Sequence, residues 1–462
     1  MLKKTNSVNQ TKIYRAFILN LFILLYVLVS PAVAKQNLTI LYTGSIWGEV
    51  KPCGCNEPEN LGGIMRRATI IEEERAANKN VLLLDAGDHF KETTDQGKLK
   101  AKTILESLSE MRYDAALLGE RDFIYGEEIL NRGFFDHWVL SNLENKNLKK
   151  GKTTKYMLKK FKDGTTVAII GLLGPELLYT KGQTNVKVED PEIELKKILW
   201  ELKVYGDKFG EEVDIVLLLT HMEKNKAKDF LKYDEVDIII NGHLEQAKLK
   251  INPEIEGKKI MVHPRDRGQY LGKITVVRNK ENIQKITNEY IRLDLKIKDN
   301  ERLKVTYDKY EVETKQIFEK WLKDTKEAEK RIFIDSIACK MCHRYEYYLW
   351  KNSKHSHSFN ESLRKANKTF DPECLECHTS GFKEGGGFMS VNITPRLADV
   401  QCEACHGPGS HHVFALMRGN VAEKNKLHKL YQKLTKESCL KCHTEKNSPE
   451  YHFATYWEKI KH

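Results

Sequence analysis

The sequence predicts an α/β domain, then a charged helix, then a small domain of mostly helical and irregular structure. Three observations support this. Residues 35–295 alternate short apolar runs with amphipathic stretches, which is the α/β pattern. Residues 296–331 are dense in lysine and glutamate, which favours a helical linker. Residues 332–462 carry four copies of the motif C-x-x-C-H.

Length and charge narrow the class of protein. With 462 residues, the chain is long enough for two or more domains, each with its own core. It has 76 Lys and Arg against 65 Asp and Glu, a formal net charge of +11. The lysines are scattered along the sequence, so we do not expect nucleic-acid binding.

The N-terminus has the features of an export signal. Basic residues precede an apolar run, Ala16–Val29, and a small-x-small cleavage pattern, Ala32–Ala34, precedes Lys35. This pattern predicts a signal peptide over residues 1–34 and a periplasmic or otherwise exported protein. An uncleaved membrane anchor is the alternative, but Asn20 and Pro31 leave the run short for a membrane span. We expect membrane contact only through the signal peptide, if it is not cleaved.

The first domain is expected to contain a sheet with its sites at one edge. The strand candidates are Leu38–Tyr42, Val81–Asp85, Ala115–Leu118, Val139–Ser141, Val167–Leu172, Ile215–Leu219, Val236–Ile240, Lys259–Val262 and Leu271–Val277. Helical patterns lie between them, for example Gly63–Asn78 and Leu99–Met111. Most of these strands end in a polar segment, and open α/β sheets place their sites at such ends.

The charged stretch from Asp299 to about Arg331 predicts a helix between the two domains. Ile317, Trp321 and Leu322 recur there at helical spacing. We interpret this helix as a solvated spacer with a narrow apolar seam.

The four C-x-x-C-H motifs define the chemistry of the second domain. Their cysteines are Cys339, Cys342, Cys374, Cys377, Cys402, Cys405, Cys439 and Cys442. This spacing lets two thiols add to the vinyl groups of a porphyrin, while the adjacent histidine reaches the iron. Zinc ribbons also use paired C-x-x-C motifs, but they do not need a histidine after every second cysteine. The sequence therefore predicts four covalently bound haem c groups, with His343, His378, His406 and His443 as proximal ligands.

Three further segments of this domain match a known family. Tyr348–His355 looks like W-x-x-S-x-H, Cys402–His412 is close to C-H-G-P-G-S-x-H, and Tyr456–His462 looks like Y-W-x-x-I-x-H. Residues 335–462 thus resemble the tetrahaem cytochrome c-554 family of periplasmic electron carriers. The resemblance implies His355, His412 and His462 as distal haem ligands.

The same resemblance implies one haem that is open on its distal side. The remaining histidines that could supply a fourth distal ligand fall in none of the matching segments; they are His357, His411, His428 and His452. We therefore expect three bis-histidine, low-spin haems and one five-coordinate, high-spin haem.

The polar segments of the first domain also follow a known order. They are Thr43–Gly48, Gly87–Asp88, Gly119–Phe123, Thr220–His221 and Gly242–Glu245. Over about residues 38–280 this order resembles the calcineurin-like metallophosphoesterases, in their 5′-nucleotidase branch. The resemblance implies a metallophosphoesterase-like αββα sandwich as the fold of this domain.

The metal-binding motifs of that family are only partly present. The resemblance implies D-x-H, G-D, G-N-H-E, a lone histidine and G-H-x-H around two metals that activate water. Asp88, His221 and His243 match, whereas five positions depart from the pattern: Ser45, Trp47, Glu120, Arg121 and Glu245. An indole or a guanidinium cannot ligate a metal. We expect ordinary nucleotidase activity to be absent or very weak.

Two cysteines lie outside the haem motifs, and they allow three interpretations. Cys53 and Cys55 are separated by one residue. A structural disulfide suits an oxidising compartment, although so small a ring would be strained. A thiolate site with Asp88, His221 and His243 would suit an additional metal ion. The third interpretation is a dithiol that exchanges electrons or sulfur.

The sequence as a whole favours an electron-transfer protein. In this hypothesis a tetrahaem c-type cytochrome exchanges electrons with redox partner proteins and is fused to a catalytically degenerate metallophosphoesterase-like domain. One alternative is a redox enzyme that acts on a small substrate, for example a sulfur compound, at Cys53 and Cys55, with the haems as electron outlet. The other is a residual metal-dependent phosphoester hydrolase.

Overall fold

The structure is a computed structural model. It describes residues 36–52, 60–149, 151–180, 186–209, 212–243, 252–279, 282–325, 333–431, 434–444, 447–448 and 450–462. The predicted signal peptide, the Cys53/Cys55 segment and Glu245 lie outside the described residues.

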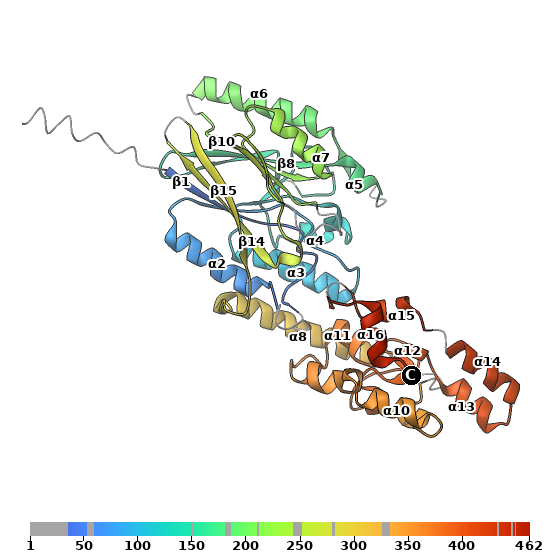
Figure 1. Cartoon of the computed structure of the whole chain (residues 1–462). Helices are drawn as coiled ribbons and strands as arrows, with labels where there is room; N and C mark the ends of the chain where they lie inside the picture. Colours follow the sequence, from blue (N-terminus) through green and yellow to red (C-terminus); the bar gives the residue numbers. More distant parts are fainter. Residues whose placement is uncertain are drawn as a thin grey trace, which may run out of the picture.

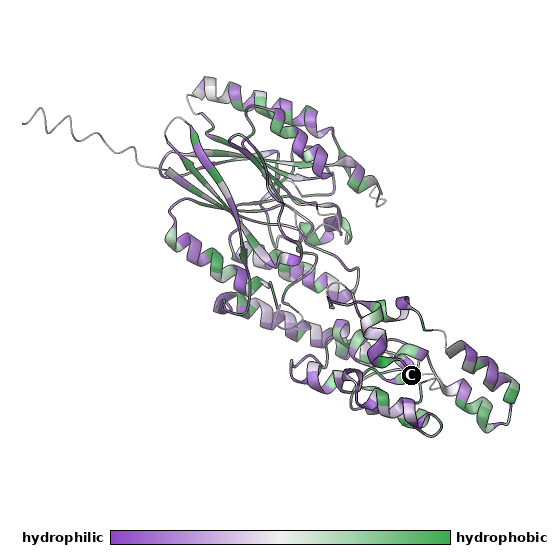
Figure 2. Ribbon diagram, in the orientation of Figure 1, coloured by the Kyte–Doolittle hydropathy of each residue, from purple (hydrophilic) through white to green (hydrophobic). Residues whose placement is uncertain are grey.

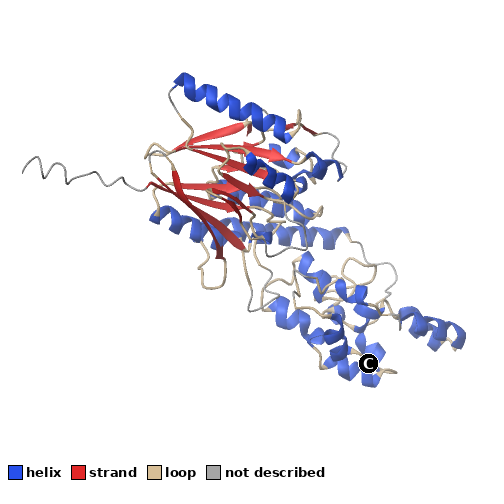
Figure 3. Cartoon of the chain, turned by 45° about the horizontal axis from the view of Figure 1, so that its top comes forward, coloured by secondary structure: helices blue, strands red, loops and turns tan. Residues whose placement is uncertain are grey.

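The N-terminal domain is built on two β-sheets that pack face to face (Figure 3). The first sheet has the order β15 (Ile283–Arg292), β14 (Tyr270–Arg278), β1 (Gln36–Thr43), β2 (Val81–Asp85), β3 (Ala115–Ala116), β4 (Trp138–Val139) and β6 (Thr153–Thr154). The second has the order β12 (Glu254–Glu256), β13 (Lys259–Val262), β11 (Ile238–Asn241), β10 (Ile215–His221), β8 (Thr166–Leu173) and β7 (Tyr156–Lys160). A two-stranded sheet joins β5 (Leu143–Glu144) to β9 (Lys187–Val188).

Helices cover the outer faces of both sheets (Figure 1). Along the first sheet lie α2 (Ile64–Ala77) and α3 (Asp95–Glu110), and α8 (Glu301–Asp324) packs against these two helices. Along the second lie α6 (Pro191–Phe209) and α7 (Lys224–Lys228). Two shorter helices are α4 (Glu128–Asn131) and α5 (Pro175–Thr180). The predicted αββα sandwich is therefore confirmed.

The central strands are apolar on both faces because each face meets a different core. In β8, Ile169 belongs to the core between the sheets, whereas Ala168 and Ile170 pack under α6. Strand β10 alternates in the same way. Parallel strands buried on both faces read as continuous hydrophobic runs, which is why the sequence reveals them. Figure 2 shows hydrophobic residues recurring along the strands of both sheets.

The predicted strands agree with the structure to different degrees. Strands β2 and β13 have the predicted bounds, while β3 and β4 are shorter than predicted. The long antiparallel strand β15 was not predicted. Most of its side chains are exposed or half-buried, so it lacks the apolar run on which the prediction relied.

Helix α8 is part of the N-terminal domain, so the interpretation as a solvated spacer was wrong. Leu303, Tyr307 and Tyr310 are buried in the core that α8 shares with α2 and α3. An ion pair of 2.8 Å between Lys102 and Glu313 adds to this contact. The buried face is built largely from tyrosine and threonine, so a search for aliphatic side chains underestimates it.

The C-terminal domain consists of short helices and irregular segments. Its α-helices are α9 (Ser336–Lys340), α10 (Arg344–Lys351), α11 (Pro372–His378), α12 (Cys402–His406), α13 (Ser410–Met417), α14 (Val421–Tyr431), α15 (Lys436–Leu440) and α16 (Phe453–Ile460). Its described apolar core is a small cluster around Phe359, Leu375 and Phe388, to which Phe318 of α8 contributes. Within the described residues, no helix of the whole chain has the length and apolarity needed to cross a membrane.

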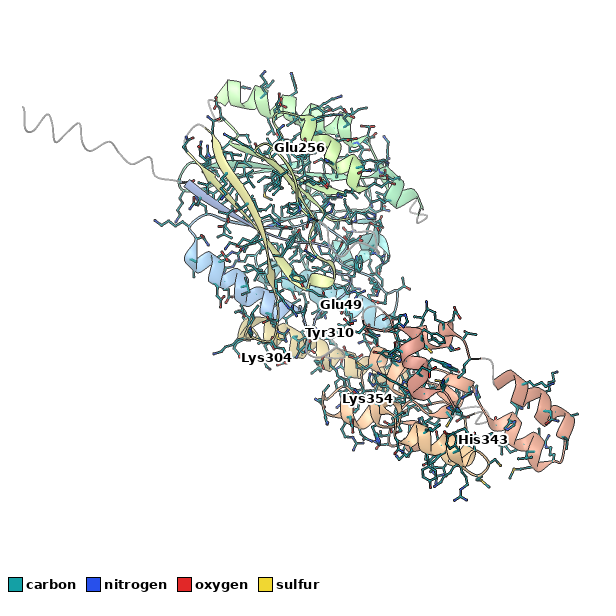
Figure 4. The ribbon with its side chains drawn as sticks, in the orientation of Figure 1. Glu49, Glu256, Lys304, Tyr310, His343 and Lys354 are labelled. Atoms are coloured by element: carbon teal, nitrogen blue, oxygen red, sulfur yellow. The ribbon has the colours of Figure 1, made fainter. Side chains whose placement is uncertain are left out.

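A buried polar contact joins the two domains at α3, α8 and α11. Gln96 at the start of α3 donates hydrogen bonds to Tyr310 Oη (3.1 Å) and Asp371 Oδ1 (2.8 Å). Lys100, one turn further along α3, pairs with Glu373 at 2.5 Å. Tyr310 lies at the junction of the two domains in Figure 4. The helix that carries the second C-x-x-C-H motif is thereby held against the N-terminal domain.

We predict that Gln96→Ala weakens this junction. The change leaves the buried carboxylate of Asp371 without its Gln96 donor and costs about 2–3 kcal/mol of unfolding free energy, measured by urea denaturation. The matched control is Lys98→Ala on the exposed face of the same turn, where the ion pair with Glu128 is solvated and the expected cost is below about 0.5 kcal/mol. Equal losses in both variants would contradict the assigned role of Gln96.

Candidate metal centre and haem-binding cavity

Four polar side chains meet where central strands of both sheets end. Asp88 follows β2, Glu120 follows β3, His221 ends β10 and His243 follows β11. Strand β2 runs parallel to β3, and β10 runs parallel to β11. The C-terminal ends of each pair therefore lie on the same edge of its sheet. The sequence prediction of a site at this edge therefore corresponds to a real cluster.

The cluster has the donor set of a metal site. His221 Nε2 is 2.7 Å from Glu120 Oε2 and 3.5 Å from Asp88 Oδ1. His243 Nδ1 is 3.6 Å from the same Glu120 oxygen. The ligand atoms of Glu120, His221 and His243 all lie within 4.8 Å of one another. Imidazole and carboxylate together suit zinc, iron or manganese.

Hydrogen bonding and charge prepare His221 for this role. Its Nδ1 donates to the Ala86 carbonyl oxygen at 2.8 Å, which directs Nε2 toward the carboxylates, as in metal-bound histidines. Burial alone would lower the pKa of His221, but Asp88 and Glu120 raise it to about 9. Burial raises the pKa of Asp88 to about 6. Buried carboxylates that hold a proton on a facing imidazole would equally attract a metal cation.

Two glycines are required for this close packing. A Cβ on Gly119 would lie 2.4 Å from Asp88 Oδ1 and 2.7 Å from His221 Cε1. A Cβ on Gly242 would lie 1.8 Å from the Ala86 carbonyl oxygen. Any larger residue at either position would push the loops of the two sheets apart, and the ligand set with them.

A second layer of buried charge supports the Asp88 loop. The ring of His89 lies between two carboxylates, with Nε2 2.9 Å from Asp85 Oδ1 and Nδ1 3.0 Å from Asp122 Oδ2. Asp122 also accepts hydrogen bonds from the backbone N–H groups of Asp88, His89 and Gly119. This layer fixes Asp88 and Glu120 relative to each other.

Among the described residues, the positions that depart from the phosphoesterase pattern form no second metal site. Ser45 Oγ donates to the Gly242 carbonyl oxygen at 2.7 Å. Arg121 pairs with Asp88, Nε to Oδ2 at 3.3 Å, and its guanidinium carbon lies 5.2 Å from the centre of the Trp47 ring. A cation and an indole thus lie on the other side of Asp88. Donor chemistry allows at most one metal ion among the described residues here.

The predicted set of metal-site residues gains one member. Asp88, His221 and His243 come together as the sequence suggested, and Glu120 joins them, although its departure from asparagine counted against a metal site. The sequence could have indicated Glu120 as a ligand, because carboxylates are common metal ligands. Whether Cys53 and Cys55 take part lies outside the described residues.

A cavity of about 2350 Å³ occupies the C-terminal domain and reaches the N-terminal one. Its lining includes residues of the second, third and fourth C-x-x-C-H motifs, among them His378, His406 and His443. Pockets for single drug-sized ligands are about 300–1,000 Å³. The volume and the thiol and imidazole lining therefore fit several large prosthetic groups.

Three pairs of histidine rings face one another around this domain. The ring centres are 6.3 Å apart for His343 and His412, 6.0 Å for His443 and His355, and 5.7 Å for His406 and His462. An imidazole nitrogen binds a transition metal at about 2.0–2.1 Å, so two imidazoles on opposite sides of one iron have centres about 6 Å apart. Each pair joins one proximal and one predicted distal histidine.

The remaining proximal histidine has different surroundings. Among the described side chains, no histidine ring faces His378 in this way. Its Nδ1 is 3.1 Å from the Ser358 carbonyl oxygen, to which it can donate, leaving Nε2 for iron. Burial lowers the pKa of His378, His355 and His443. A lowered pKa favours the neutral ring, which is the form that binds metal.

Motifs distant in sequence are neighbours in space. Interaction with the Cys402 thiol raises the pKa of the Cys339 thiol, and interaction with Cys377 raises that of Cys442. Glu403, inside the third motif, accepts a hydrogen bond of 2.9 Å from the Asp335 N–H just before the first motif. The first motif therefore adjoins the third, and the second adjoins the fourth.

Known proteins resemble the two halves of the chain separately. Residues 338–407 match the family model described as cytochrome c554 and c-prime. Cytochrome c-554 of Nitrosomonas europaea is 33% identical over 85 residues, which are 15% of this chain and 36% of that protein. This match suggests electron transfer and implies covalently bound haem c.

The N-terminal half is similar to 5′-nucleotidases. Snake venom 5′-nucleotidase of Crotalus adamanteus is 26% identical over 316 residues, which cover 62% of this chain and 53% of that protein. The chain thus spans about half the length of this relative. The structure of the Haemophilus influenzae NAD nucleotidase has a TM-score of 0.52 at 16% identity, covering 65% of this chain and 62% of that one. These matches give the fold and suggest a phosphoesterase-like domain.

We predict that His89→Leu destabilises the N-terminal domain strongly. Removal of the ring leaves the buried carboxylates of Asp85 and Asp122 facing each other, and breaking such a buried ion pair costs about 3–5 kcal/mol. His137→Leu is the control, because His137 is exposed and should cost less than about 0.5 kcal/mol. Circular dichroism during urea unfolding measures the free energy of unfolding of both variants. A small loss in His89→Leu would argue against a stabilising role for the buried contacts of His89 with Asp85 and Asp122.

Proposed function

We propose that this chain is an exported tetrahaem electron-transfer protein whose phosphoesterase-like domain has kept one metal position and lost the other. The match to cytochrome c554 supports electron transfer. The cluster of Asp88, Glu120, His221 and His243 supports a single metal ion. Its redox partners would be other proteins, and an exported location agrees with the N-terminal signal pattern.

The three facing histidine pairs are the observation on which this proposal rests. They support His412 as the distal ligand of the haem at Cys339 and Cys342, His462 as that of the haem at Cys402 and Cys405, and His355 as that of the haem at Cys439 and Cys442. By the same reasoning, the haem attached at Cys374 and Cys377 has His378 as its one histidine ligand.

The protein side chains would fix the prosthetic groups and their neighbours. When bound, haem c supplies one-electron transfer, and six-coordinate iron suits transfer better than ligand binding. The proximity of the first motif to the third, and of the second to the fourth, brings the attached groups close together. Ser358 and Ser448, which contact Nδ1 of His378 and His443, orient the proximal rings.

A residual metal-dependent hydrolase is the second candidate, and the buried ligand cluster favours it. One metal could lower the pKa of a bound water. Arg121 occupies the position at which the family places a histidine, and it pairs with Asp88. Without a second metal and that histidine, we expect phosphoester hydrolysis to be absent or very weak. The redox enzyme that uses Cys53 and Cys55 stays a prediction.

We predict four covalent haems, three of them low-spin and one high-spin. Intact mass of the mature protein should show an excess of four haem units, and electron paramagnetic resonance should show one high-spin haem in four. His412→Ala should raise this to two in four, because the first haem loses its distal ligand. His411→Ala, the neighbouring exposed histidine, is the matched control and should leave the spin states unchanged.

Several outcomes would contradict this assignment. Four low-spin signals in the wild-type protein, without response to carbon monoxide or nitric oxide, would remove the open haem. A change with His411→Ala but not with His412→Ala would reverse the distal assignment. A mass close to that of the bare chain with bound zinc would exclude haem altogether.

We also predict that the protein binds one divalent metal ion besides haem iron. After chelation and reloading with Zn²⁺ or Mn²⁺, elemental analysis should give about one equivalent per chain. Glu120→Ala and His243→Ala should each weaken metal binding at least about tenfold, because even the loss of a residue that only supports a metal ligand lowers metal affinity by about that factor. Glu127→Ala, seven residues away in the same loop region, is the control. Nucleotide turnover that depends on His221 would show that the hydrolytic centre has survived.

A further inference from the structure

The first C-x-x-C-H motif lies apart from the other three. The described lining of the large cavity includes residues of the second, third and fourth motifs and none of residues 339–343. Figure 4 shows His343 on the side of the C-terminal domain that is turned away from Tyr310 and the N-terminal domain. Cys342 is exposed, and Met341 is 81% exposed. The first motif is therefore at the outer surface of its domain.

Helices α9 and α10 carry this surface, which is called the outer face below and comprises residues 337–351. Its centre is apolar, because Met341 and Tyr345 are both largely exposed, Tyr345 to 70%. Figure 1 shows α10 at the end of the C-terminal domain that is far from the two sheets. Exposed apolar side chains that lie close together, with polar residues around them, are typical of a surface that binds another molecule.

Three cations surround this apolar centre. Lys340, Arg344 and Lys351 form no ion pair with any residue that the structure describes. The ammonium nitrogen of Lys340 lies 4.9 Å from the ring centre of Tyr347 and 5.2 Å from that of Tyr348. Such ring contacts hold an ammonium group in place and leave its charge uncompensated. The outer face thus presents positive charge that the domain itself does not neutralise.

Nearby acidic groups are engaged within the domain. Asp335 accepts hydrogen bonds from the first backbone N–H groups of α9 and lies 3.6 Å from Arg396. Glu403 is buried and accepts the backbone N–H groups of Asp335 and Gly409. Glu346 is the one acidic residue of the outer face, against its three basic residues. The face therefore has an excess of positive charge.

Haem attached to the first motif would not cancel this charge. Cys339 and Cys342 would bind the vinyl edge of the porphyrin, and the propionates of haem lie on the opposite edge. Lys340 stands between these two cysteines in the sequence, so it belongs to the vinyl side. The rings of His343 and His412, whose centres are 6.3 Å apart, would hold the iron directly behind the outer face.

We propose that the outer face is the docking site of an acidic redox protein, which exchanges single electrons with the haem of the first motif. Charges of opposite sign speed the encounter of two proteins and orient them, and an apolar centre suits close contact. Each transfer oxidises one of the two proteins by one electron and reduces the other by one. The inference rests on the proposed function and adds the chemistry of the partner and the haem that it reaches.

Stopped-flow reduction of the oxidised holoprotein by reduced flavodoxin, an acidic one-electron donor, tests the inference. Lys340→Glu and Arg344→Glu should each lower the second-order rate constant about fivefold at low ionic strength, because the attraction that steers the encounter is lost. At about 1 M salt, where charges are screened within about 3 Å, the variants should approach the wild-type rate. Calorimetric titration with oxidised flavodoxin measures docking without electron transfer and should show the same order of affinities.

Lys285→Glu is the matched control. It makes the same change in net charge, on an exposed residue of β15 in the N-terminal domain, and should leave the rate constant within about 1.5-fold of wild type. Haem content is measured on every sample by pyridine haemochrome. Arg344 lies outside the C-x-x-C-H motif, so Arg344→Glu gives a clear result even if Lys340→Glu takes up less haem.

The outcomes separate this inference from the proposed function. Equal slowing by Lys285→Glu, rates that do not depend on salt, or binding to phosphatidylglycerol vesicles without binding to flavodoxin would each overturn the docking site. Four haems together with wild-type rates in Lys340→Glu and Arg344→Glu would contradict the docking site and leave the proposed function standing. Flavodoxin binding that Arg344→Glu weakens, in a protein that lacks the four haems, would support the docking site and contradict the proposed function.

Discussion

The carboxylate of Asp122 is the constraint on which the candidate metal centre depends. It accepts three backbone hydrogen bonds, from Asp88, His89 and Gly119, and faces the ring of His89. The loop after β2 and the loop after β3 therefore share one buried acceptor and cannot move independently. Because a buried carboxylate is costly without such partners, this arrangement is rigid, and Asp88 and Glu120 are presented together to the two histidines.

The contact between the domains links the loop that carries Asp88 to the C-terminal domain. Helix α3 begins a few residues after Asp88, and its first turn carries Gln96, which bonds to both α8 and the start of α11. The second haem motif is thus connected to the metal centre through the short segment between Asp88 and Gln96 and through the buried contacts of Gln96. The two halves of the chain also share a cavity, which their separate matches to known proteins could not have revealed.

The sequence determined the fold class because segments that are buried on both faces consist almost entirely of apolar residues. Strands buried on both faces, such as β8 and β10, are continuous apolar runs, which predict the α/β class. The sandwich itself was implied by the resemblance of the polar segments to a known family. The sequence did not determine β15, whose polar side chains give no such run, or the packing of α8. Tyrosine and threonine bury or expose their side chains according to their neighbours, so the role of Leu303, Tyr307 and Tyr310 was decided by tertiary contacts.

For the sites, the sequence predicted which cysteines bind haem covalently, because the C-x-x-C-H spacing is a local chemical requirement. It also placed Asp88, His221 and His243 at strand ends. Which histidine faces which, and that Arg121 and Trp47 lie on the far side of Asp88, only the tertiary structure decided. These relations join residues far apart in the chain, such as His343 with His412 or Glu120 with His221, and their distances depend on how sheets and helices pack.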